Sequence, residues 1–272
     1  MATCYRHPNR ETGVSCSNCG RAICTDCMTP ISVGMRCPEC AKQRTQVRTA
    51  SSLQRDPTVT YVLIAINVIV FIAASVGGGG LAGGVHGKLL NNLALDADKI
   101  KHGQEYWRLI TSGFMHASLL HIGFNMYILY FMGRMLEPSI GRIRFLAIYF
   151  TALLTGAFGA LLVTPHSLTI GASGAIFGLF GGAFVAMRAR GFDPMQSGLG
   201  ALILINLALS FVLSGISIGG HIGGLIGGAA AGYVLVDVGD RLSSPAIPLL
   251  ACLGISAVAV AASIVASSSL VA

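Results

Sequence analysis

Residues 215–232 read GISIGGHIGGLIGGAAAG, and this stretch decides the fold. Its glycines recur every four residues in two stripes, Gly215, Gly219, Gly223 and Gly227, and Gly220, Gly224, Gly228 and Gly232. Residues four apart share a helix face, so each stripe lets the backbone of another helix approach closely. A third stripe with this spacing, Gly174, Gly178 and Gly182, predicts that residues 173–188 and 217–236 pack tightly together.

The composition of the whole chain is that of a membrane protein. Hydrophobic residues make up 53% of the 272 residues and charged residues only 11%, whereas soluble domains carry about 25% charged residues. These proportions exclude a disordered chain, a coiled coil and an ordinary soluble enzyme. Residues 1–58 hold 8 of the 18 basic residues and 7 of the 8 cysteines. This asymmetry predicts a small polar head before a polytopic membrane domain.

Seven apolar runs follow the head, each close to the ~20 residues with which a helix crosses a bilayer. They are residues 59–76, 117–136, 145–163, 173–188, 199–214, 217–236 and 246–266. We therefore expect an all-α polytopic membrane protein, a six-helix bundle with a seventh, C-terminal transmembrane helix. The first run begins near Thr58, behind cysteine pairs, which is unlike a secretory signal peptide.

Basic residues beside the runs predict the orientation. If the count of spans is right, one side of the membrane carries Arg134, Arg142, Arg144, Arg188, Arg190 and Arg241, and also Lys42, Arg44, Arg48 and Arg55 before the first run. The positive-inside rule makes that side, with the N-terminus, cytoplasmic. The net charge of +7 then reflects membrane orientation and does not argue for nucleic acid. Because no organelle-targeting segment precedes the head, we expect a prokaryotic plasma membrane.

The other side carries one long loop, about residues 77–116. It begins with a flexible glycine stretch, residues 77–80, and contains Tyr106 and Trp107, whose rings suit the membrane interface. We expect no regular structure there from the sequence pattern.

The head, residues 1–43, contains four pairs of metal-ligand residues, each with a two-residue gap. They are Cys4 and His7, Cys16 and Cys19, Cys24 and Cys27, and Cys37 and Cys40. Eight such ligands suffice for two tetrahedral zinc sites. A disulfide scaffold is the alternative, but a reducing cytoplasm and the histidine argue against it. Too little chain separates the second and third pairs to wrap one ion, so we expect interleaved sites: Cys4, His7, Cys24 and Cys27 on one Zn²⁺, and Cys16, Cys19, Cys37 and Cys40 on the other.

The head resembles a B-box-type zinc finger, and a domain this small should be unfolded without metal. Protein binding, nucleic-acid binding and docking at the membrane surface all remain open as its role. Residues 44–58 are interpreted as a basic linker and residues 59–272 as the membrane domain. The eighth cysteine, Cys252, lies in the last apolar run. We interpret it as a small buried apolar residue.

Polar residues within the apolar runs are functional hypotheses by default. His116, His121 and Asn125 lie near the start of the second run, and His121 and Asn125 share a helix face. Hydrogen bonding between helices is the alternative interpretation. Ser173, flanked by glycines, opens the fourth run and is sterically open to a carbonyl group, although small-residue packing explains this pattern better when it stands alone. His221 lies near the start of the sixth run.

Tight packing of the fourth and sixth runs brings the Ser173 hydroxyl within reach of the His221 imidazole. A serine needs such a base to become a nucleophile. No acidic residue lies in a run near His221, so the sequence predicts a Ser–His dyad and no triad. Phe177, one turn after Ser173, either orients the imidazole or simply packs.

With these elements the chain resembles the rhomboid family of intramembrane serine proteases. The matching elements are Trp107-Arg108, His116-x4-His121-x3-Asn125, Gly171-x-Ser173-Gly174 and Gly220-His221-Ile222-Gly223-Gly224. They occur in family order over about residues 59–240. The resemblance implies a six-helix core, often with a seventh helix, and a water-filled cavity open to the outer face. It also implies cleavage of single-span membrane proteins near the membrane surface.

Position by position, the resemblance makes Ser173 the nucleophile and His221 the general base. It assigns His121 and Asn125, with the backbone N–H of Ser173, to the oxyanion, and makes His116 a structural or water-holding residue. In the same way, Trp107 and Arg108 would take a structural role in the outer loop, and Glu137 would steady the cytoplasmic end of the second helix. The family core does not require the zinc head.

Three other functions compete with this one. A catalytically silent rhomboid-like protein, which binds membrane proteins, usually lacks the serine or the histidine, and both are present. A transporter or channel would show carboxylates through the spans or an inverted repeat. A third alternative is that the head is the functional module and the membrane part is only its anchor. One span would suffice for anchoring, so seven apolar runs would be unexplained. We therefore expect a serine endopeptidase whose partners are the bilayer and its membrane substrates, with a head that regulates it or binds a cytoplasmic protein.

Overall fold

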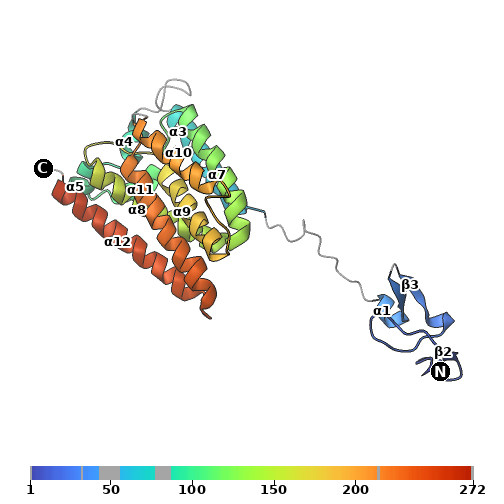
Figure 1. Ribbon diagram of the computed structural model, residues 1–272. Coiled ribbons are helices and arrows are strands. Elements are labelled where there is room, and N and C mark those ends of the chain that lie inside the picture. The colour runs from blue at the N-terminus through green and yellow to red at the C-terminus, as the bar shows by residue number, and fades with distance from the viewer. Residues whose placement is uncertain (1, 32, 43–55, 77–86, 213–214, 271–272) are drawn as a thin grey trace. The chain divides into compact units, whose positions relative to one another are not determined.

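The computed structural model describes residues 2–31, 33–42, 56–76, 87–212 and 215–270. Two compact units divide the chain, residues 1–54 and residues 55–272, and each has its own core (Figure 1). Of the predicted linker, residues 44–58, only residues 56–58 are described. The predicted glycine stretch at residues 77–80 lies outside the described residues.

The head contains short elements around a core made almost wholly of cysteine. Its elements are β1 (Ala2–Thr3), β2 (Glu11–Thr12), η1 (Thr25–Cys27), β3 (Thr29–Ile31), β4 (Gly34–Arg36) and α1 (Pro38–Lys42). β1 pairs with β2 and β3 with β4, both antiparallel. Apart from Ile23, the buried core residues described in this unit are all cysteines. So small an apolar core cannot offset the conformational entropy of folding. The head therefore needs a further link between its cysteines, such as a shared metal ion, to be stable.

The membrane domain consists of seven long helices at the positions of the seven apolar runs. They are α3 (Thr58–Val76), α7 (Leu119–Ile140), α8 (Arg142–Val163), α9 (Ser173–Ala189), α10 (Leu199–Val212), α11 (Ile218–Gly232) and α12 (Ala246–Leu270). A π-helical segment, Tyr233–Val238, and a 3-10 turn, Gly239–Arg241, extend α11.

The lengths and compositions of these helices are those of a membrane-spanning bundle. Within the described ranges, four stretches are long and apolar enough to cross a membrane by themselves: α3, α8, α12 and residues Ile218–Arg241. α9 and α10 are shorter apolar helices. The predicted fold class, an all-α polytopic membrane protein, is therefore confirmed.

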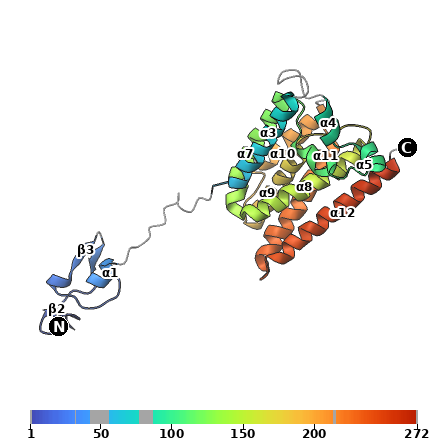
Figure 2. The ribbon, with the colours of Figure 1, turned by 180° about the vertical axis from the view of Figure 1, so that it is seen from behind.

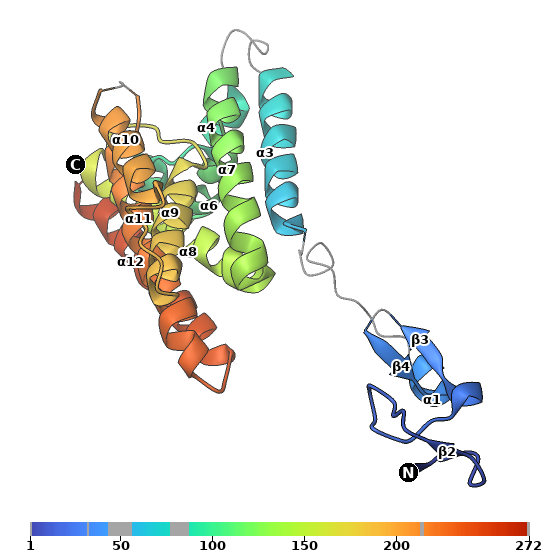
Figure 3. The same cartoon turned by 45° about the vertical axis from the view of Figure 1, so that its right-hand side comes forward.

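α8, α9 and α11 pack against one another and form the centre of the bundle. α12 runs along α8 on one side, as Figure 1 and the view from behind in Figure 2 both show. On the other side of the bundle α3 lies beside α7 (Figure 3). The seventh helix is thus an addition to one side of the bundle.

The predicted stripes of α9 and α11 face each other. Their facing pairs are Gly174 and Gly224, Gly178 and Gly228, and Gly182 and Gly232. A Cβ atom added to Gly228 would overlap the backbone of Gly178, and one added to Gly232 would lie 2.7 Å from the Cα of Gly182. The two helices therefore touch through their backbones, and on α11 the contact requires glycine at Gly224, Gly228 and Gly232.

The other stripe of α11, which contains Gly219, Gly223 and Gly227, faces α8. Gly219 and Gly223 lie against Gly159, and Gly227 lies against the side chain of Thr155. α11 therefore makes backbone contacts on two of its faces, which fixes its position and its rotation.

Gly215 does not belong to this stripe, contrary to the prediction. It precedes α11 with a φ of +82°, and no neighbouring atom lies within 4 Å of its Cβ position. The helix begins at Ile218 because the hydroxyl of Ser217 accepts a hydrogen bond from the N–H of Gly220 and caps it. The four-residue spacing of the glycines therefore extends upstream of the first residue of the helix.

Glu137 links the end of α7 to the start of α3. Its carboxylate is 1% exposed and accepts hydrogen bonds from the N–H groups of Val59 and Thr60 at 2.9 and 2.8 Å. The Thr60 hydroxyl donates a third bond at 2.7 Å. A buried carboxylate is costly unless its lone pairs find donors, and the N-terminus of a helix supplies them.

Residues 87–116 form four short helices, where the sequence predicted a loop. They are α4 (Lys88–Leu93), α5 (Ala97–Gly103), α6 (Arg108–Thr111) and η2 (Ser112–Phe114). None is longer than seven residues, too short for a hydrophobic period to appear. Arg108, 1% exposed, donates to the Glu105 carboxylate and to the Ala94 carbonyl, at 2.7 Å in both cases. Trp107 is half exposed and donates to the Asn92 carbonyl.

The backbone contact between α9 and α11 yields the first testable prediction. Gly228→Ala should destabilise the domain by about 1–3 kcal/mol, because the new methyl group overlaps the Gly178 backbone. Gly254→Ala in α12 is the matched control, since no neighbouring atom lies within 4 Å of its Cβ position. That variant should be as stable as the wild type or slightly more stable. Thermal unfolding in detergent measures both, and equal melting temperatures would contradict the packing assigned to Gly228.

Candidate active site and metal centres

Ser173 is the first residue of α9, and an unusual turn precedes it. Gly171 has a φ of +127°, which residues with a side chain rarely adopt. Its N–H donates to the Ser112 carbonyl at 2.9 Å. A Cβ atom at Gly171 would lie 2.8 Å from Nε2 of His121 and 3.7 Å from Oγ of Ser173. The turn therefore requires glycine, and it brings the hydroxyl and the His121 imidazole to one place.

His221 lies in the first turn of α11 and is 6% exposed. Its ring stacks on that of Phe177, with centroids 4.0 Å apart and an angle of 16° between the planes. Its Nδ1 lies 2.6 Å from Oγ of Ser210, a residue of α10. Its Nε2 is buried and has no hydrogen-bond partner in the described structure. The ring is therefore held on one face and at one nitrogen, and the second nitrogen has no competing partner.

Ser173 and His221 lie at the same end of two neighbouring helices, as predicted. Gly174, which follows Ser173, is in contact with Gly220, which precedes His221. Phe177, one turn after Ser173, carries the His221 ring. No hydrogen bond joins Oγ of Ser173 to Nε2 of His221 in this structure. Such bonds are often long before a substrate binds, so the arrangement is compatible with a dyad.

No carboxylate takes part in this arrangement. Among the described residues, no hydrogen bond or ion pair links an acidic side chain to His221. Glu105 pairs with Arg108, and Glu137 binds the start of α3. The serine–histidine pair without an acidic third member stays a prediction.

His121 and Asn125 occupy the first two turns of α7. Nδ1 of His121 accepts a hydrogen bond from the Ala117 N–H at 3.4 Å, which leaves Nε2, near Gly171, as the nitrogen that carries the proton. Nδ2 of Asn125 donates to the His121 carbonyl at 2.9 Å. One of the two amide hydrogens of Asn125 is thus used within the helix, and the other is available.

His116 lies next to His121 and is fully buried. Its ring meets the His121 ring edge to face, with centroids 5.0 Å apart. Neither of its ring nitrogens has a hydrogen-bond partner among the described residues. Buried polar atoms in native proteins are normally satisfied by protein or by ordered water. This pattern is typical of a histidine that holds a water molecule.

A small cavity opens beside Ser173. Its volume of about 30 Å³ is enough for one or two water molecules. Besides Ser173, its walls include Ser112, Gly156, Ala160, Gly171, Ser217 and Gly220. The cavity can hold the water that a hydrolysis needs inside a domain that is otherwise apolar.

The sequence did not point to Ser210 as a partner of His221. A serine in an apolar run is a weak signal, because serine often donates to the carbonyl four residues earlier. Ser210 does so, to the Asn206 carbonyl at 2.9 Å. Only the packing of α10 against α11 brings its oxygen to the imidazole. For Phe177 the sequence left orientation of the imidazole and plain packing open, and the structure stacks its ring on that of His221.

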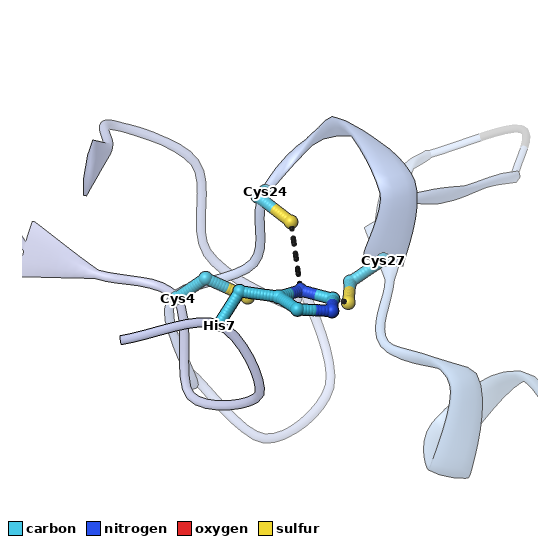
Figure 4. A group of neighbouring side chains, drawn as sticks. All are labelled: Cys4, His7, Cys24 and Cys27. Atoms are coloured by element: carbon cyan, nitrogen blue, oxygen red, sulfur yellow. Dashed lines mark hydrogen bonds between the residues drawn. The ribbon is translucent and has the colours of Figure 1, made fainter. Parts of the chain in front are cut away.

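The head brings its eight predicted ligand residues together in two groups. Cys4, His7, Cys24 and Cys27 form one group, and Cys16, Cys19, Cys37 and Cys40 form the other. The ligand atoms of each group lie within 4.8 Å of one another. These are the interleaved groups expected from the spacing. Figure 4 shows the His7 imidazole between the sulfur atoms of the first group.

The distances within the groups fit one tetrahedral ion each. With Zn–S bonds of about 2.3 Å, sulfur atoms at the corners of a tetrahedron lie about 3.8 Å apart. Sγ of Cys19 and Sγ of Cys37 are 3.8 Å apart, and Nδ1 of His7 lies 3.3 to 3.8 Å from the three sulfur atoms of its group. Three sulfurs with one imidazole, and four sulfurs, are donor sets that zinc prefers.

A backbone hydrogen bond favours the thiolate at one position of the second group. The N–H of Cys37 donates to Sγ of Cys16 at 3.3 Å, and this bond lowers the pKa of the Cys16 thiol to about 6. The thiolate, which is the form that binds metal, is therefore favoured at neutral pH. The Tyr5 hydroxyl donates to the Glu39 carboxylate and lowers its pKa to about 2, and Arg6 pairs with the same carboxylate. These bonds tie the start of the chain to α1.

Comparison with known proteins identifies relatives of the membrane domain. The profile of the rhomboid domain matches residues 103–238, which is half of the chain. The rhomboid protease GluP of Bacillus subtilis (strain 168) is 33% identical over 180 residues, which cover 64% of this chain and 34% of that protein.

Two plant proteins widen this comparison. The mitochondrial RHOMBOID-like protein 6 of Arabidopsis thaliana is 36% identical over 125 residues, 44% of this chain and 40% of that protein. The inactive RHOMBOID-like protein 8 of the same plant is 27% identical over 179 residues, 56% of this chain and 50% of that protein. The chain thus spans between a third and a half of the length of these relatives, which include a protease and an inactive protein.

The metal content of the purified full-length protein tests the two clusters. We expect two zinc ions per protein chain when the metal content is measured by elemental mass spectrometry. Cys24→Ala and Cys37→Ala should each reduce this to one, because each removes a ligand of a different group. Cys252→Ala, which changes a buried cysteine in α12, is the control and should leave two. Retention of both ions by Cys24→Ala would remove Cys24 from the metal ligands.

Proposed function

Because the chain belongs to the rhomboid family, we propose that it is an intramembrane serine endopeptidase that cleaves single-span membrane proteins near the outer surface of the membrane. The family acts on transmembrane substrates in the bilayer, but it contains active and inactive members. One observation carries the proposal of activity. His221 is held by Phe177 and Ser210 with Nε2 unpartnered, at the same end of the bundle as the Ser173 hydroxyl.

In the proposed reaction, Oγ of Ser173 attacks the carbonyl carbon of the scissile peptide bond. Nε2 of His221 accepts the hydroxyl proton as the new C–O bond forms. The imidazolium then donates this proton to the leaving nitrogen, and the C–N bond breaks. This leaves an acyl-enzyme on Ser173.

The oxyanion that forms on the carbonyl oxygen needs donors in fixed positions. The Ser173 N–H is one, because N–H groups in the first turn of a helix have no intrahelical acceptor and lie at the positive end of the helix dipole. Nε2–H of His121 is a second donor, and the unused amide hydrogen of Asn125 is a third. His116, packed on the edge of His121, supports this group.

The second half of the reaction needs water, and lipid excludes it. The cavity beside Ser173 can supply a water molecule to the acyl-enzyme. His221 would take a proton from this water as its oxygen attacks the ester carbonyl, and would return the proton to Oγ of Ser173. This restores the enzyme and releases the carboxylic acid product.

We also propose that the metal in both clusters of the head is zinc, held by the eight Cys and His residues. We further propose a prokaryotic plasma membrane with a cytoplasmic N-terminus, and the basic residues beside the spans support this orientation. In this orientation the head is cytoplasmic. We assign it a regulatory role or the binding of a cytoplasmic protein.

Labelling with a fluorophosphonate probe in native membranes tests the dyad without knowledge of a substrate. The wild type should be labelled, and Ser173→Ala and His221→Ala should both fall to background, because one loses the nucleophile and the other its base. GluP, assayed in parallel, is the positive control. If the wild type stays unlabelled while GluP reacts, the proposal of activity is wrong and the alternative, a silent membrane-protein binder, is favoured.

The oxyanion donors are tested by the rate of the same labelling, since the phosphonyl oxygen becomes negative during the reaction. Asn125→Ala should lower the rate by about a hundredfold. Asn206→Ala in α10 is a matched control, because the side chain of Asn206 also donates to the carbonyl four residues earlier, at 2.8 Å. It should leave the rate within about twofold of the wild type. A near-normal rate for Asn125→Ala would remove Asn125 from the oxyanion role.

A further inference from the structure

We propose that Ser210 is a positioning residue for His221: its oxygen accepts the Nδ1–H proton and so keeps Nε2 unprotonated to act as the base. This proposal rests on the proposed function. The contact is short, at 2.6 Å, and Ser210 is 2% exposed, so water does not compete for it. Within the described structure it is the only hydrogen bond to the imidazole.

Counting protons decides the direction of the bond. The Ser210 hydroxyl has one proton, and it is donated to the Asn206 carbonyl at 2.9 Å. The oxygen can then only accept, so Nδ1 of His221 must carry a proton. In a neutral imidazole the other nitrogen, Nε2, is then the acceptor. This is the tautomer that a general base requires.

The opposite tautomer makes fewer hydrogen bonds. If the Ser210 hydroxyl turned to donate to Nδ1, the proton of His221 would lie on Nε2. Nε2 has no partner among the described residues in either tautomer, so the two tautomers differ only in the bonds of Ser210. In the opposite tautomer the Asn206 carbonyl would lose the serine bond. The observed packing therefore favours Nδ1–H.

Ser210 restrains a motion that Phe177 leaves open. Stacking on a flat ring prevents His221 from tilting, but it does not prevent rotation of the imidazole within its own plane. A hydrogen bond at Nδ1 determines which edge of the ring points toward α10, and hence where Nε2 lies. Phe177 and Ser210 thus act on different degrees of freedom, and both come from helices other than α11.

A hydroxyl also suits the location of the dyad. An acidic partner would stabilise the imidazolium more strongly, but an ionised carboxylate within a membrane domain is costly unless it is paired. A serine accepts the same proton without a charge. When His221 takes the proton of Ser173, the hydrogen bond between Ser210 and Nδ1 of His221 becomes charge-assisted and strengthens. Ser210 therefore contributes more in the transition state than in the resting enzyme.

The test compares Ser210→Ala with Ser210→Thr in the full-length protein, using the concentration dependence of fluorophosphonate labelling. Ser210→Ala should lower the maximal labelling rate about ten- to a hundredfold, because it removes a hydrogen bond to a charged imidazolium. The half-saturating probe concentration should not change. Ser210→Thr should recover most of the rate, because a threonine hydroxyl in a helix can make the same bonds.

Ser263→Ala in α12 is the matched control. Ser263 is fully buried and donates to the carbonyl four residues earlier at 2.8 Å, as Ser210 does, but it contacts no imidazole. It should label at the wild-type rate. Melting temperatures of all three variants show whether each is folded.

The outcomes separate this proposal from the proposed function. If the wild type is labelled and Ser210→Ala labels equally fast, the role of Ser210 is wrong and the dyad stands. If Ser210→Thr is folded but as slow as Ser210→Ala, or if Ser263→Ala is equally slow, the effect is one of packing and the proposal is overturned. If the wild type itself is not labelled, both proposals fail.

Discussion

Contact between glycine backbones is the constraint on which the rest of the membrane domain depends. Helices in lipid gain little from burying apolar surface, and they associate through close van der Waals packing and hydrogen bonds. Where Gly178 faces Gly228, a side chain at Gly228 would force α9 and α11 apart. Because Ser173 and His221 each lie in the first turn of one of these helices, such a separation would also move the hydroxyl from the imidazole. The contact that holds the bundle together is therefore also the one that assembles the proposed dyad.

The same apolar setting governs every buried polar group. The carboxylate of Glu137 receives three hydrogen bonds and the guanidinium of Arg108 reaches a carboxylate and a carbonyl, so both charges are satisfied within the domain. Among the described residues of this domain, Oδ1 of Asn67 and the Tyr149 hydroxyl have no hydrogen-bond partner. Near the turn at Gly171, the ring nitrogens of His116 and Nε2 of His221 have none either. These nitrogens lie in the region that the proposed reaction uses, where water and a substrate would supply the missing partners.

Much of this arrangement could be predicted because it depends on regular spacing. Runs of about 20 apolar residues located all seven long helices, and glycines four apart identified the faces of α9 and α11 that meet. Spacing failed where a local interaction ended or created an element. The Ser217 cap ends the stripe before Gly215, and the bonds of Arg108 organise short helices between residues 87 and 116 that have no visible period.

The sequence by itself determined the membrane class of the protein, its long helices and the grouping of its metal ligands, since each of these follows from residue type and distance along the chain. It also predicted that Ser173 and His221 form a pair, because two glycine stripes bring the starts of their helices together. Only the tertiary structure decided how the imidazole is held. The bond from His221 to Ser210 joins two helices whose relative rotation no spacing encodes, and a serine in an apolar run makes the same intrahelical bond whether or not a histidine lies beside it.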